Sequence, residues 1–572
     1  MYGRHMTFQA ASGLFAVLFL AFGISAQDQS GRSNPEQASA TALPQGSPRA
    51  ALHAILGAGR LEDLRWPNFP DYRVHVENFY RHSDYSLAWV RQGRPTPQAL
   101  DMIEVLQQAD LQGLRADDYD SSRWAERLER LQREPTLRDQ AHFDVALTVC
   151  TMRYVSDVRV GRANPRYFQF RLNVGPKELD LSTFVQSYLV NGTDLKSELA
   201  KIEPPIASYR EMKRALLTYL RMAKEDDGEK LPDPHGIVFS GTQYDGVPRL
   251  ARLLHLLGDL PESEVVSEDS RLYDGALVEA VKRFQERHGL RIDGYLELKT
   301  LEQLNVPISY RVEQIRLALE RFRWLRYDFP RPPIVVNIPA FRLYAFNDEG
   351  GIDLTMSVDV GGEDAASTRT PVLEDEIEYL VFRPYWDVPL SIQRDEIVPN
   401  IREDPDYLSE VHFEVIAPGG QVVTNGRVTR EILQGVSAGK LRVRQKPGPE
   451  NSLGLVKFIF PNRYNVYLHD TPSWENFFGH SARSVSHGCV HVEKPDELAA
   501  WVLRDKSEWT LERIRHAMQD GQDDFKVHLT KPIPVMILYT TALAREHGDI
   551  HFYPDIYGYD AELLAKGYPT PR

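Results

Sequence analysis

Residues 486–491 read Ser-His-Gly-Cys-Val-His, and residues 467–470 read Tyr-Leu-His-Asp. The cysteine in the first segment, Cys489, is one of two in a chain of 572 residues. A thiolate attacks carbonyl carbon readily, and a nearby histidine can accept the proton of the thiol. The glycine before the cysteine indicates a tight turn, at which the main-chain amides of Gly488 and Cys489 can face a developing oxyanion. The two segments therefore predict a thiol nucleophile at Cys489 and a general base at His469.

The spacing of these residues, a histidine and then sixteen residues before Ser-His-Gly-Cys, resembles the signature of YkuD-type L,D-transpeptidases, which cross-link bacterial peptidoglycan. Residues 370–371, 384–389 and 444–454 resemble further blocks of the large YcbB-like members of this family. The resemblance implies a multidomain α+β protein. Its β-sandwich catalytic domain would span residues 331–543, with a capping insertion at residues 391–447 beside the active site.

The resemblance also implies roles for the residues around the nucleophile. Cys489 would attack the peptide stem, and His469 would be oriented by a main-chain carbonyl near Asp470. Ser486, His487 and Gly488 would shape the turn. No metal and no other cofactor would be required. The candidates for contact with the substrate are Arg483, His491, Trp386, Tyr385, Asp470 and Trp474.

One position departs from the family pattern. The family commonly has an arginine two residues after the cysteine, where this chain has His491. A histidine cannot form the two parallel hydrogen bonds that an arginine makes to a carboxylate. The substitution places carboxylate recognition at this position in doubt, and Arg483 is the residue that would compensate.

The region before the catalytic domain has mostly helical patterns. We expect a helical scaffold over residues 49–246. In one predicted helix, residues 209–223, apolar residues recur at helical spacing and should be buried. Residues 154–165 contain Gly, Asn and Pro and interrupt the helical pattern, which predicts a loop. The apolar residues of the predicted helix are Met212, Leu216, Leu217 and Leu220.

Residues 247–306 show three short helical patterns separated by two Asp-Gly turns. Residues 280–290, followed by Asp293 and Gly294, resemble a peptidoglycan-binding domain of type 1. The resemblance implies a small three-helix unit that positions the enzyme on the wall polymer. A return helix of the scaffold is expected over residues 307–330, and a C-terminal extension over residues 544–572.

The N-terminus has the features of an export signal. Arg4 precedes an apolar run, and Ser25 and Ala26 provide small residues for cleavage. We expect a signal peptide at residues 1–26, a flexible linker at residues 27–48 and a periplasmic location. An uncleaved membrane anchor is the alternative. The net charge of −14 is unsuited to binding nucleic acid, which requires a basic surface.

The second cysteine, Cys150, lies in an apolar stretch and is expected to be a buried small side chain. A disulfide between Cys150 and Cys489 is the competing hypothesis, because exported proteins form disulfides. Such a bond would remove the nucleophile.

The implied reaction is a 3–3 cross-link between peptidoglycan stems, formed through an acyl-enzyme on a tetrapeptide donor. The expected partners are the stem peptides, the glycan and other proteins of cell-wall synthesis. Resolution of the acyl-enzyme by water, giving an L,D-carboxypeptidase, or by another amine or protein is the first alternative. A non-catalytic wall-binding scaffold and a zinc peptidase are more remote. The zinc ligands would come from His469, Asp470, His480, His487, Cys489 and His491.

Overall fold

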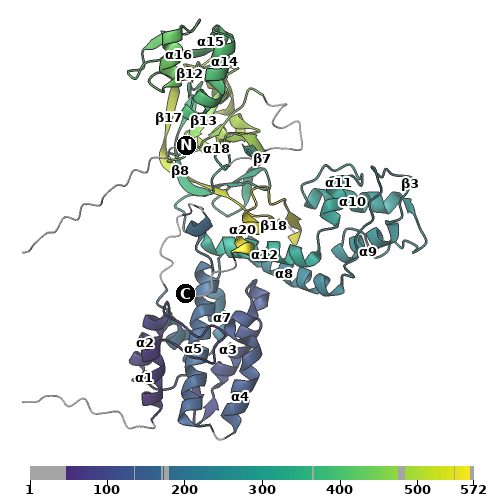
Figure 1. Ribbon diagram of the computed structural model, residues 1–572, viewed down its shortest axis with the longest axis vertical. Helices are drawn as coiled ribbons and strands as arrows, with labels where there is room; N and C mark the ends of the chain where they lie inside the picture. The colour runs from purple at the N-terminus through teal and green to yellow at the C-terminus, as the bar shows by residue number, and fades with distance from the viewer. Residues whose placement is uncertain are drawn as a thin grey trace, which may run out of the picture. The chain divides into compact units, whose positions relative to one another are not determined.

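The computed structural model describes residues 47–133, 135–168, 170, 172, 179–363, 366–473, 484–545 and 548–566. The predicted signal peptide, almost all of the predicted linker, Trp474, His480 and Arg483 lie outside the described residues. Within the described part of the chain, no helix is long and apolar enough to cross a membrane. The predicted fold class is confirmed: a helical N-terminal region precedes a small helical domain and a β-rich catalytic domain (Figure 1).

The N-terminal helical region has its own hydrophobic core, which runs from Leu52 to Ile202 and includes the fully buried Trp89. Thr136 and Asp139 form a capping box at the start of the longest helix, α5. The elements are α1 (Pro48–Ala58), α2 (Arg73–His82), β1 (Val90–Arg91), β2 (Arg94–Pro95), α3 (Pro97–Gln107), η1 (Ala109–Gln112), η2 (Ala116–Tyr119), η3 (Ser121–Arg123), α4 (Trp124–Gln132), α5 (Leu137–Val160), η4 (Pro165–Phe168), α6 (Leu181–Phe184), η5 (Val185–Val190) and α7 (Leu195–Lys201).

The predicted loop at residues 154–165 is wrong in its first half, because α5 continues to Val160. Tyr154, Val155 and Val158 are buried, so the apolar helical spacing extends further than the sequence interpretation allowed. The helix ends at Gly161, whose φ is 84°. A Cβ at this position would lie 2.6 Å from Glu320 Oε1, so both the backbone conformation and the close packing require glycine.

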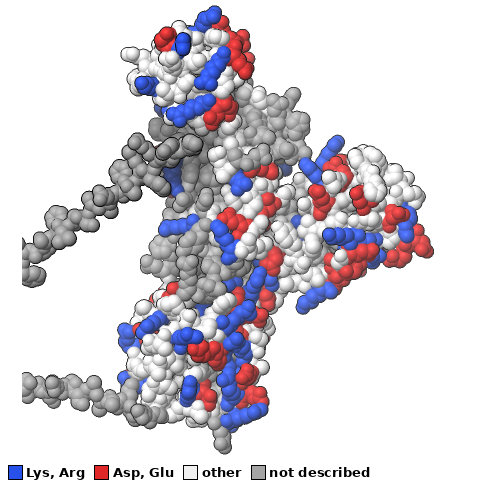
Figure 2. Space-filling model, viewed as in Figure 1, with Lys and Arg blue, Asp and Glu red and all other residues white. Residues whose placement is uncertain are grey.

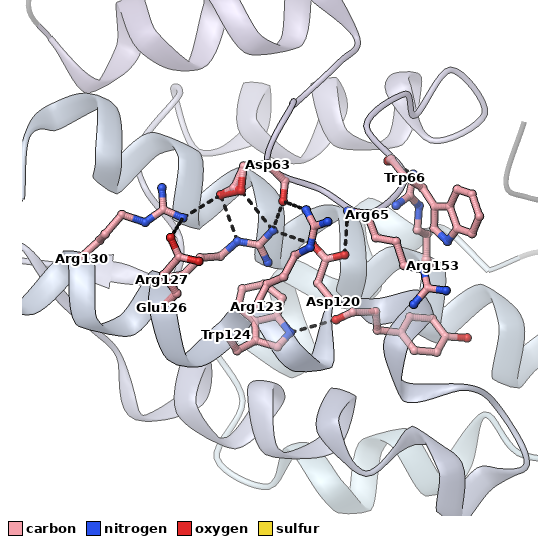
Figure 3. A network of polar contacts seen from close by, with 11 residues as sticks. Asp63, Arg65, Trp66, Asp120, Arg123, Trp124, Glu126, Arg127, Arg130 and Arg153 are labelled. Atoms are coloured by element: carbon pink, nitrogen blue, oxygen red, sulfur yellow. Dashed lines mark hydrogen bonds and ion pairs between the residues drawn. The ribbon is translucent and has the colours of Figure 1, made fainter.

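A buried polar network ties the loops of this region to α4 (Figure 3). The guanidinium of Arg127 lies between Asp120, at 2.5 Å, and Asp63, at 3.1 Å. Burial raises the pKa of Asp63, but the hydrogen bond and the charge of Arg127 outweigh burial and lower it. Arg153 donates to the carbonyl oxygens of Trp66 and Asn68 in the same neighbourhood.

The following helices fit the prediction, with one exception. Met212 and Leu216 on α8 are fully buried, but Leu217 is 47% exposed because it points about 100° away from Leu216 around the helix. The predicted small three-helix unit corresponds to α9, α10 and α11. The elements are α8 (Ala207–Glu225), β3 (Thr242–Gln243), α9 (Val247–Leu257), β4 (Leu272–Tyr273), α10 (Gly275–Arg287), α11 (Leu298–Leu304) and the return helix α12 (Ile308–Trp324).

The catalytic region contains a sheet that closes on itself. Its strand order is β15-β7-β16-β14-β13-β8-β17-β5-β6, and β6 also pairs with β7, so eight strands form a ring to which β15 is added. The expected sandwich is therefore a closed barrel with mixed strand directions. The strands are β5 (Ile334–Asn337), β6 (Arg342–Phe346), β7 (Ile352–Gly361), β8 (Leu373–Phe382), β13 (Val456–Ile459), β14 (Leu468–His469), β15 (Ser484–Ser486), β16 (Val490–Val492) and β17 (Phe525–Leu538).

The predicted capping insertion is a compact unit with its own hydrophobic core, which includes Val388, Leu408 and Val443. Its sheet has the order β11-β10-β12-β9, so it also recruits Trp386 and Asp387, which precede the predicted insertion. Its elements are β9 (Trp386–Asp387), α13 (Leu390–Ile392), η6 (Gln393–Ile397), α14 (Val398–Glu403), α15 (Tyr407–Glu410), β10 (Phe413–Ile416), β11 (Val422–Thr424), α16 (Arg430–Ser437) and β12 (Arg442–Gln445).

Between the barrel strands β16 and β17 the chain forms α18 (Pro495–Val502) and α19 (Leu511–Gln519), and after β17 it forms β18 (Ala542–Ala544), β19 (Ile550–Phe552) and α20 (Tyr559–Ala565). On the face that Figure 2 shows, basic and acidic side chains are interspersed over the described surface. Arg252, for example, forms ion pairs with Asp227, Glu229 and Glu268. Such exposed pairs contribute little to stability.

Candidate active site

The register of four neighbouring barrel strands aligns four polar residues. Lys457 on β13 is opposite His469 on β14, which is opposite His491 on β16, which is opposite Asp359 on β7. Residues paired across strands project to the same face of a sheet, whereas their neighbours along each strand project to the other. The neighbours Phe458, Leu468 and Val490 are all buried in the hydrophobic core. We call Lys457, His469, His491 and Asp359 the polar row.

Cys489 directly precedes β16 and therefore lies two residues before His491 of the polar row. The main-chain N–H of Val490 donates to the carbonyl oxygen of Tyr467 at 3.0 Å, which fixes the start of the strand. The Sγ of Cys489 lies 3.7 Å from Asn465 O. Within the described residues, the hydrogen bonds of this thiol go to main-chain groups and none joins it to His469.

The turn before Cys489 is held by side-chain hydroxyl groups. Ser486 Oγ donates to Cys489 O at 2.6 Å and accepts from Gly488 N–H at 3.1 Å. Thr370 Oγ1 donates to Gly488 O at 3.0 Å. Gly488 has a φ of 110°, a conformation that side chains disfavour. The Gly488 N–H, which the sequence analysis expects to face an oxyanion, donates to Ser486 Oγ within the turn in this structure.

His469 is almost fully buried, and its Nδ1 lies 2.6 Å from Asp470 O. A proton on Nδ1 donates to this carbonyl oxygen, which leaves Nε2 as the acceptor. The side chain of Asp470 instead accepts from Leu455 N–H and Thr471 N–H, so Asp470 orients the imidazole through its main chain. Burial, with a smaller contribution from the charge of Lys457, lowers the pKa of His469 to about 4 against the opposing effect of the hydrogen bond to Asp470.

The other titratable groups of the site are also shifted. Burial raises the pKa of the Cys489 thiol to about 11, while the Tyr467 N–H and the charge of Lys457 act to lower it. The ring of His491 lies 4.4 Å from that of His469, between centroids, and burial lowers the pKa of His491 well below its ordinary value. Both histidines are therefore neutral near pH 7, and the thiol is protonated.

Sequence reasoning missed two residues of this site, Lys457 and Thr370. Lys457 Nζ donates to Tyr385 O at 3.3 Å, and Thr370 is fully buried. A signal for Lys457 exists in the sequence, because a lysine between Val456 and Phe458 interrupts an otherwise apolar strand. The link of Thr370 to Gly488 has no local signal.

The remaining predicted residues lie around the junction with the capping insertion. The imidazole Nε2 of His487 lies 2.7 Å from Glu396 Oε1 in η6, so the turn touches the insertion. The Arg444 guanidinium lies 4.2 Å from the centre of the Tyr385 ring. Trp386 packs against the core of the insertion, 6.0 Å from Phe413 between ring centroids.

Both cysteines are free thiols. Cys150 is fully buried in α5, and burial raises its pKa to about 12, as expected for an unreactive core side chain. Within the described ranges, no group of three or more His, Cys, Asp and Glu side chains is arranged to hold a metal ion. His480, a proposed ligand in the zinc alternative, lies outside those ranges.

Three segments of the chain match known domain families. Residues 74–216 match a scaffold domain, residues 243–304 match a "Putative peptidoglycan binding domain", and residues 331–527 match the L,D-transpeptidase catalytic domain. The protein therefore contains the catalytic domain of cysteine-dependent L,D-transpeptidases, and this domain holds the site described above.

One curated relative has a name that agrees with this class. A "Putative L,D-transpeptidase" of Haemophilus influenzae is 34% identical over 230 residues, which are 40% of this chain and 45% of the relative. The chain thus spans about half the length of the curated relative it matches.

Two solved structures were compared with the chain. One is an L,D-transpeptidase from Xylanimonas cellulosilytica (14% identity, 54% of this chain, 99% of that chain, TM-score 0.18). The other is a fused Zn-dependent amidase/peptidase/peptidoglycan-binding protein from Clostridium acetobutylicum (13% identity, 53% of this chain, 99% of that chain, TM-score 0.15). TM-scores this low do not establish a shared fold.

Proposed function

We propose that the protein is a peptidoglycan L,D-transpeptidase that forms 3–3 cross-links through an acyl-enzyme on Cys489. The observation that carries the proposal is the position of Cys489 at a hydrogen-bonded turn that leads into β16, whose pairing with β14 aligns His491 with the buried, neutral His469, inside an L,D-transpeptidase catalytic domain. A neutral imidazole is the form that can accept the proton of the thiol.

In the first half of the reaction, Cys489 Sγ attacks the carbonyl of the third residue of a tetrapeptide stem. His469 Nε2 accepts the thiol proton and returns it to the amine of the leaving D-alanine, so a thioester forms and the amide bond breaks. The carbonyl oxygen of Asp470 holds the Nδ1 proton of the imidazole, which keeps Nε2 available throughout.

In the second half, the side-chain amine of a diamino acid on a neighbouring stem attacks the thioester. This step forms the 3–3 amide and restores the thiol. Water competes with the amine for the acyl-enzyme. The contact of the capping insertion with the turn, through His487 and Glu396, supports a role for the insertion in shielding the thioester from water.

An enzyme that acts on peptidoglycan has to work outside the cytoplasm, where this polymer lies. The sequence features at residues 1–26 support export to the periplasm. The domain at residues 243–304 supports binding to the wall polymer. By resemblance to the family, we expect carbapenems to acylate Cys489.

The test is mass spectrometry of disaccharide-tetrapeptide incubated with purified protein, with and without EDTA. We expect tetrapeptide–tripeptide dimers that persist in EDTA and disappear in Cys489→Ala, with Cys150→Ala as the matched control that retains activity. Tripeptide monomers alone would replace the proposal with an L,D-carboxypeptidase. Activity in Cys489→Ala, or its loss in EDTA, would overturn the thiol mechanism.

A further inference from the structure

We propose that Lys457 supplies the positive charge that stabilises the thiolate of Cys489. The inference deepens the proposed function, because it rests on Cys489 as the nucleophile. It identifies a residue that acts on the reacting sulfur through its electric field.

The first argument is position. Lys457 is the register neighbour of His469, and β14, which carries His469, is in turn paired with the strand that follows Cys489. The side chains of the polar row project to one face of the sheet. The cation therefore lies on the same face of the barrel as the proposed base, within two strands of the nucleophile.

The second argument is the set of partners that Lys457 has. Its Nζ donates to an uncharged acceptor, Tyr385 O, at 3.3 Å. Among the residues that the structure describes, no carboxylate forms an ion pair with it. Without such a contact, the charges of Asp524 and Asp387 favour its ammonium form at longer range than an ion pair, and the charge of Cys489 adds to them. A mostly buried ammonium without a carboxylate in contact is costly, and a nearby anion would relieve this cost.

The third argument is that the same charge acts on both partners of the proton transfer. It favours the ionised form of Cys489 and disfavours the ionised form of His469. Burial opposes ionisation of the thiol, so an opposite charge in the same poorly hydrated surroundings has a larger effect than it would have in water. A less basic imidazole is also a stronger acid once protonated, which assists departure of the amine.

The fourth argument concerns the other members of the row. His469 and His491 are neutral, since burial lowers the pKa of both. Burial lowers the pKa of Lys457 as well, but from an ordinary value far above that of a histidine, and the charges of Asp524 and Asp387 oppose the shift. Lys457 is therefore the member of the polar row best suited to carry a positive charge.

The experiment measures how fast iodoacetamide alkylates the thiol at pH 8, which needs no peptidoglycan. Cys489→Ala provides the baseline, because Cys150 is fully buried. The test variant is Lys457→Met, which keeps the length of the side chain and removes the charge. Lys457→Arg keeps the charge. Lys526→Met is the matched control. Lys526 is a half-exposed lysine on β17, and it pairs with Val381 of β8, the residue with which Lys457 also pairs from the other side.

We expect Lys457→Met to react at least about threefold more slowly than the wild type. One unit of thiol pKa lowers the thiolate fraction tenfold, and the higher basicity of the remaining thiolate restores about half of this loss on a logarithmic scale. The alkylation rates of Lys457→Arg and Lys526→Met should stay within about twofold of the wild-type rate. Near-ultraviolet circular dichroism verifies that each variant is folded.

An unchanged alkylation rate in folded Lys457→Met would overturn the proposal. A rate in Lys457→Arg as low as in Lys457→Met would also overturn it, since the effect would then not follow the charge. Failure of the proposed function is recognised separately, by the absence of cross-linked dimers from a wild type whose Cys489 is alkylated normally.

Discussion

The ionisation states of single residues define how the site can work. The main-chain carbonyl of Asp470 fixes the tautomer of His469, and burial keeps both His469 and the Cys489 thiol uncharged. In the resting site the imidazole is therefore neutral and the thiol is protonated, so proton transfer has to accompany attack on the substrate.

This resting state predicts a broad pH profile for acylation of Cys489. The imidazole is neutral above its pKa of about 4 and the thiol is protonated below its pKa of about 11. The second-order acylation rate constant, followed by intact-protein mass spectrometry, should therefore be nearly constant between about pH 5 and pH 9. His469→Ala should lower it by at least about 10²-fold.

The surface variant His516→Ala is the control, because His516 is exposed on α19. An acidic limb centred near pH 6.5 would show that His469 keeps its ordinary pKa and would contradict this account.

Among single residues of the site, the contacts that could be predicted from the sequence are those between residues close together in the chain. His469 and Asp470 are adjacent residues, and the turn before Cys489 is local, so these contacts could be foreseen. Lys457 and Thr370 reach the site only through strand pairing and a long-range hydrogen bond. A lysine inside an apolar strand is a signal, but the register that aligns Lys457 with His469 cannot be derived from one strand alone, and Thr370 was missed because its partner Gly488 is distant in the chain.

At the scale of elements, the packing of α4 involves a buried charged residue, Arg127, which pairs with Asp120 and Asp63. The Arg127 side chain is only 2% exposed and its partner Asp120 only 1%. Removing one member of a buried pair leaves the other charge without compensation.

Arg127→Met should therefore lower the free energy of unfolding by about 3–5 kcal/mol. Urea unfolding followed by circular dichroism measures this change. Arg130→Met is the matched control, since Arg130 is 46% exposed and also pairs with Asp63, at 3.5 Å. It should cost less than about 1 kcal/mol. Equal losses for the two variants would refute the special role of the buried arginine.

The elements themselves were largely predictable, since apolar residues at a helical period fixed α8, α9, α10 and α12. The two errors have the same origin, because the periodicity of apolar residues along a helix does not show which side of the helix is buried by its neighbours. Leu217 has the chemistry of a core residue and remains outside, whereas Val158 continues α5 inside a segment that was interpreted as a loop.

At the scale of the whole molecule, the small three-helix unit and the C-terminal strands share a buried histidine. The ring of His288, the residue directly after α10, stacks on Phe284, at 3.8 Å between centroids, and on Phe552 of β19, at 5.6 Å. Burial lowers the pKa of His288 well below its ordinary value, and the charges of Arg311 and Arg287 act in the same direction. The sequence predicted the unit but not this junction, because an apolar stripe does not identify its partner.

The sign of the resulting pH dependence follows from proton binding. Below about pH 6.5 this histidine is protonated in the unfolded chain but not in the folded protein. Its contribution to the free energy of unfolding is therefore fully present above that pH and is lost as the pH falls. Each pH unit in this window should cost up to about 1.4 kcal/mol for this group.

His288→Gln should reduce the slope of unfolding free energy against pH between about pH 6.5 and pH 5, measured by urea titration at each pH. The exposed His235→Gln is the control and should leave the slope unchanged. An identical slope in His288→Gln would contradict a neutral, buried His288.

The closure of the barrel has a consequence for how the chain acquires its structure. The early strand β5 pairs in parallel with the end of β17, with Ile334 opposite Val535 and Asn337 opposite Leu538. Loop-closure entropy makes such distant pairings slow to form. The strands β5, β6 and β7 can pair with one another early, but the ring cannot close until β17 has been synthesised. During synthesis the edge of β5 that β17 later covers therefore stays open to chaperones.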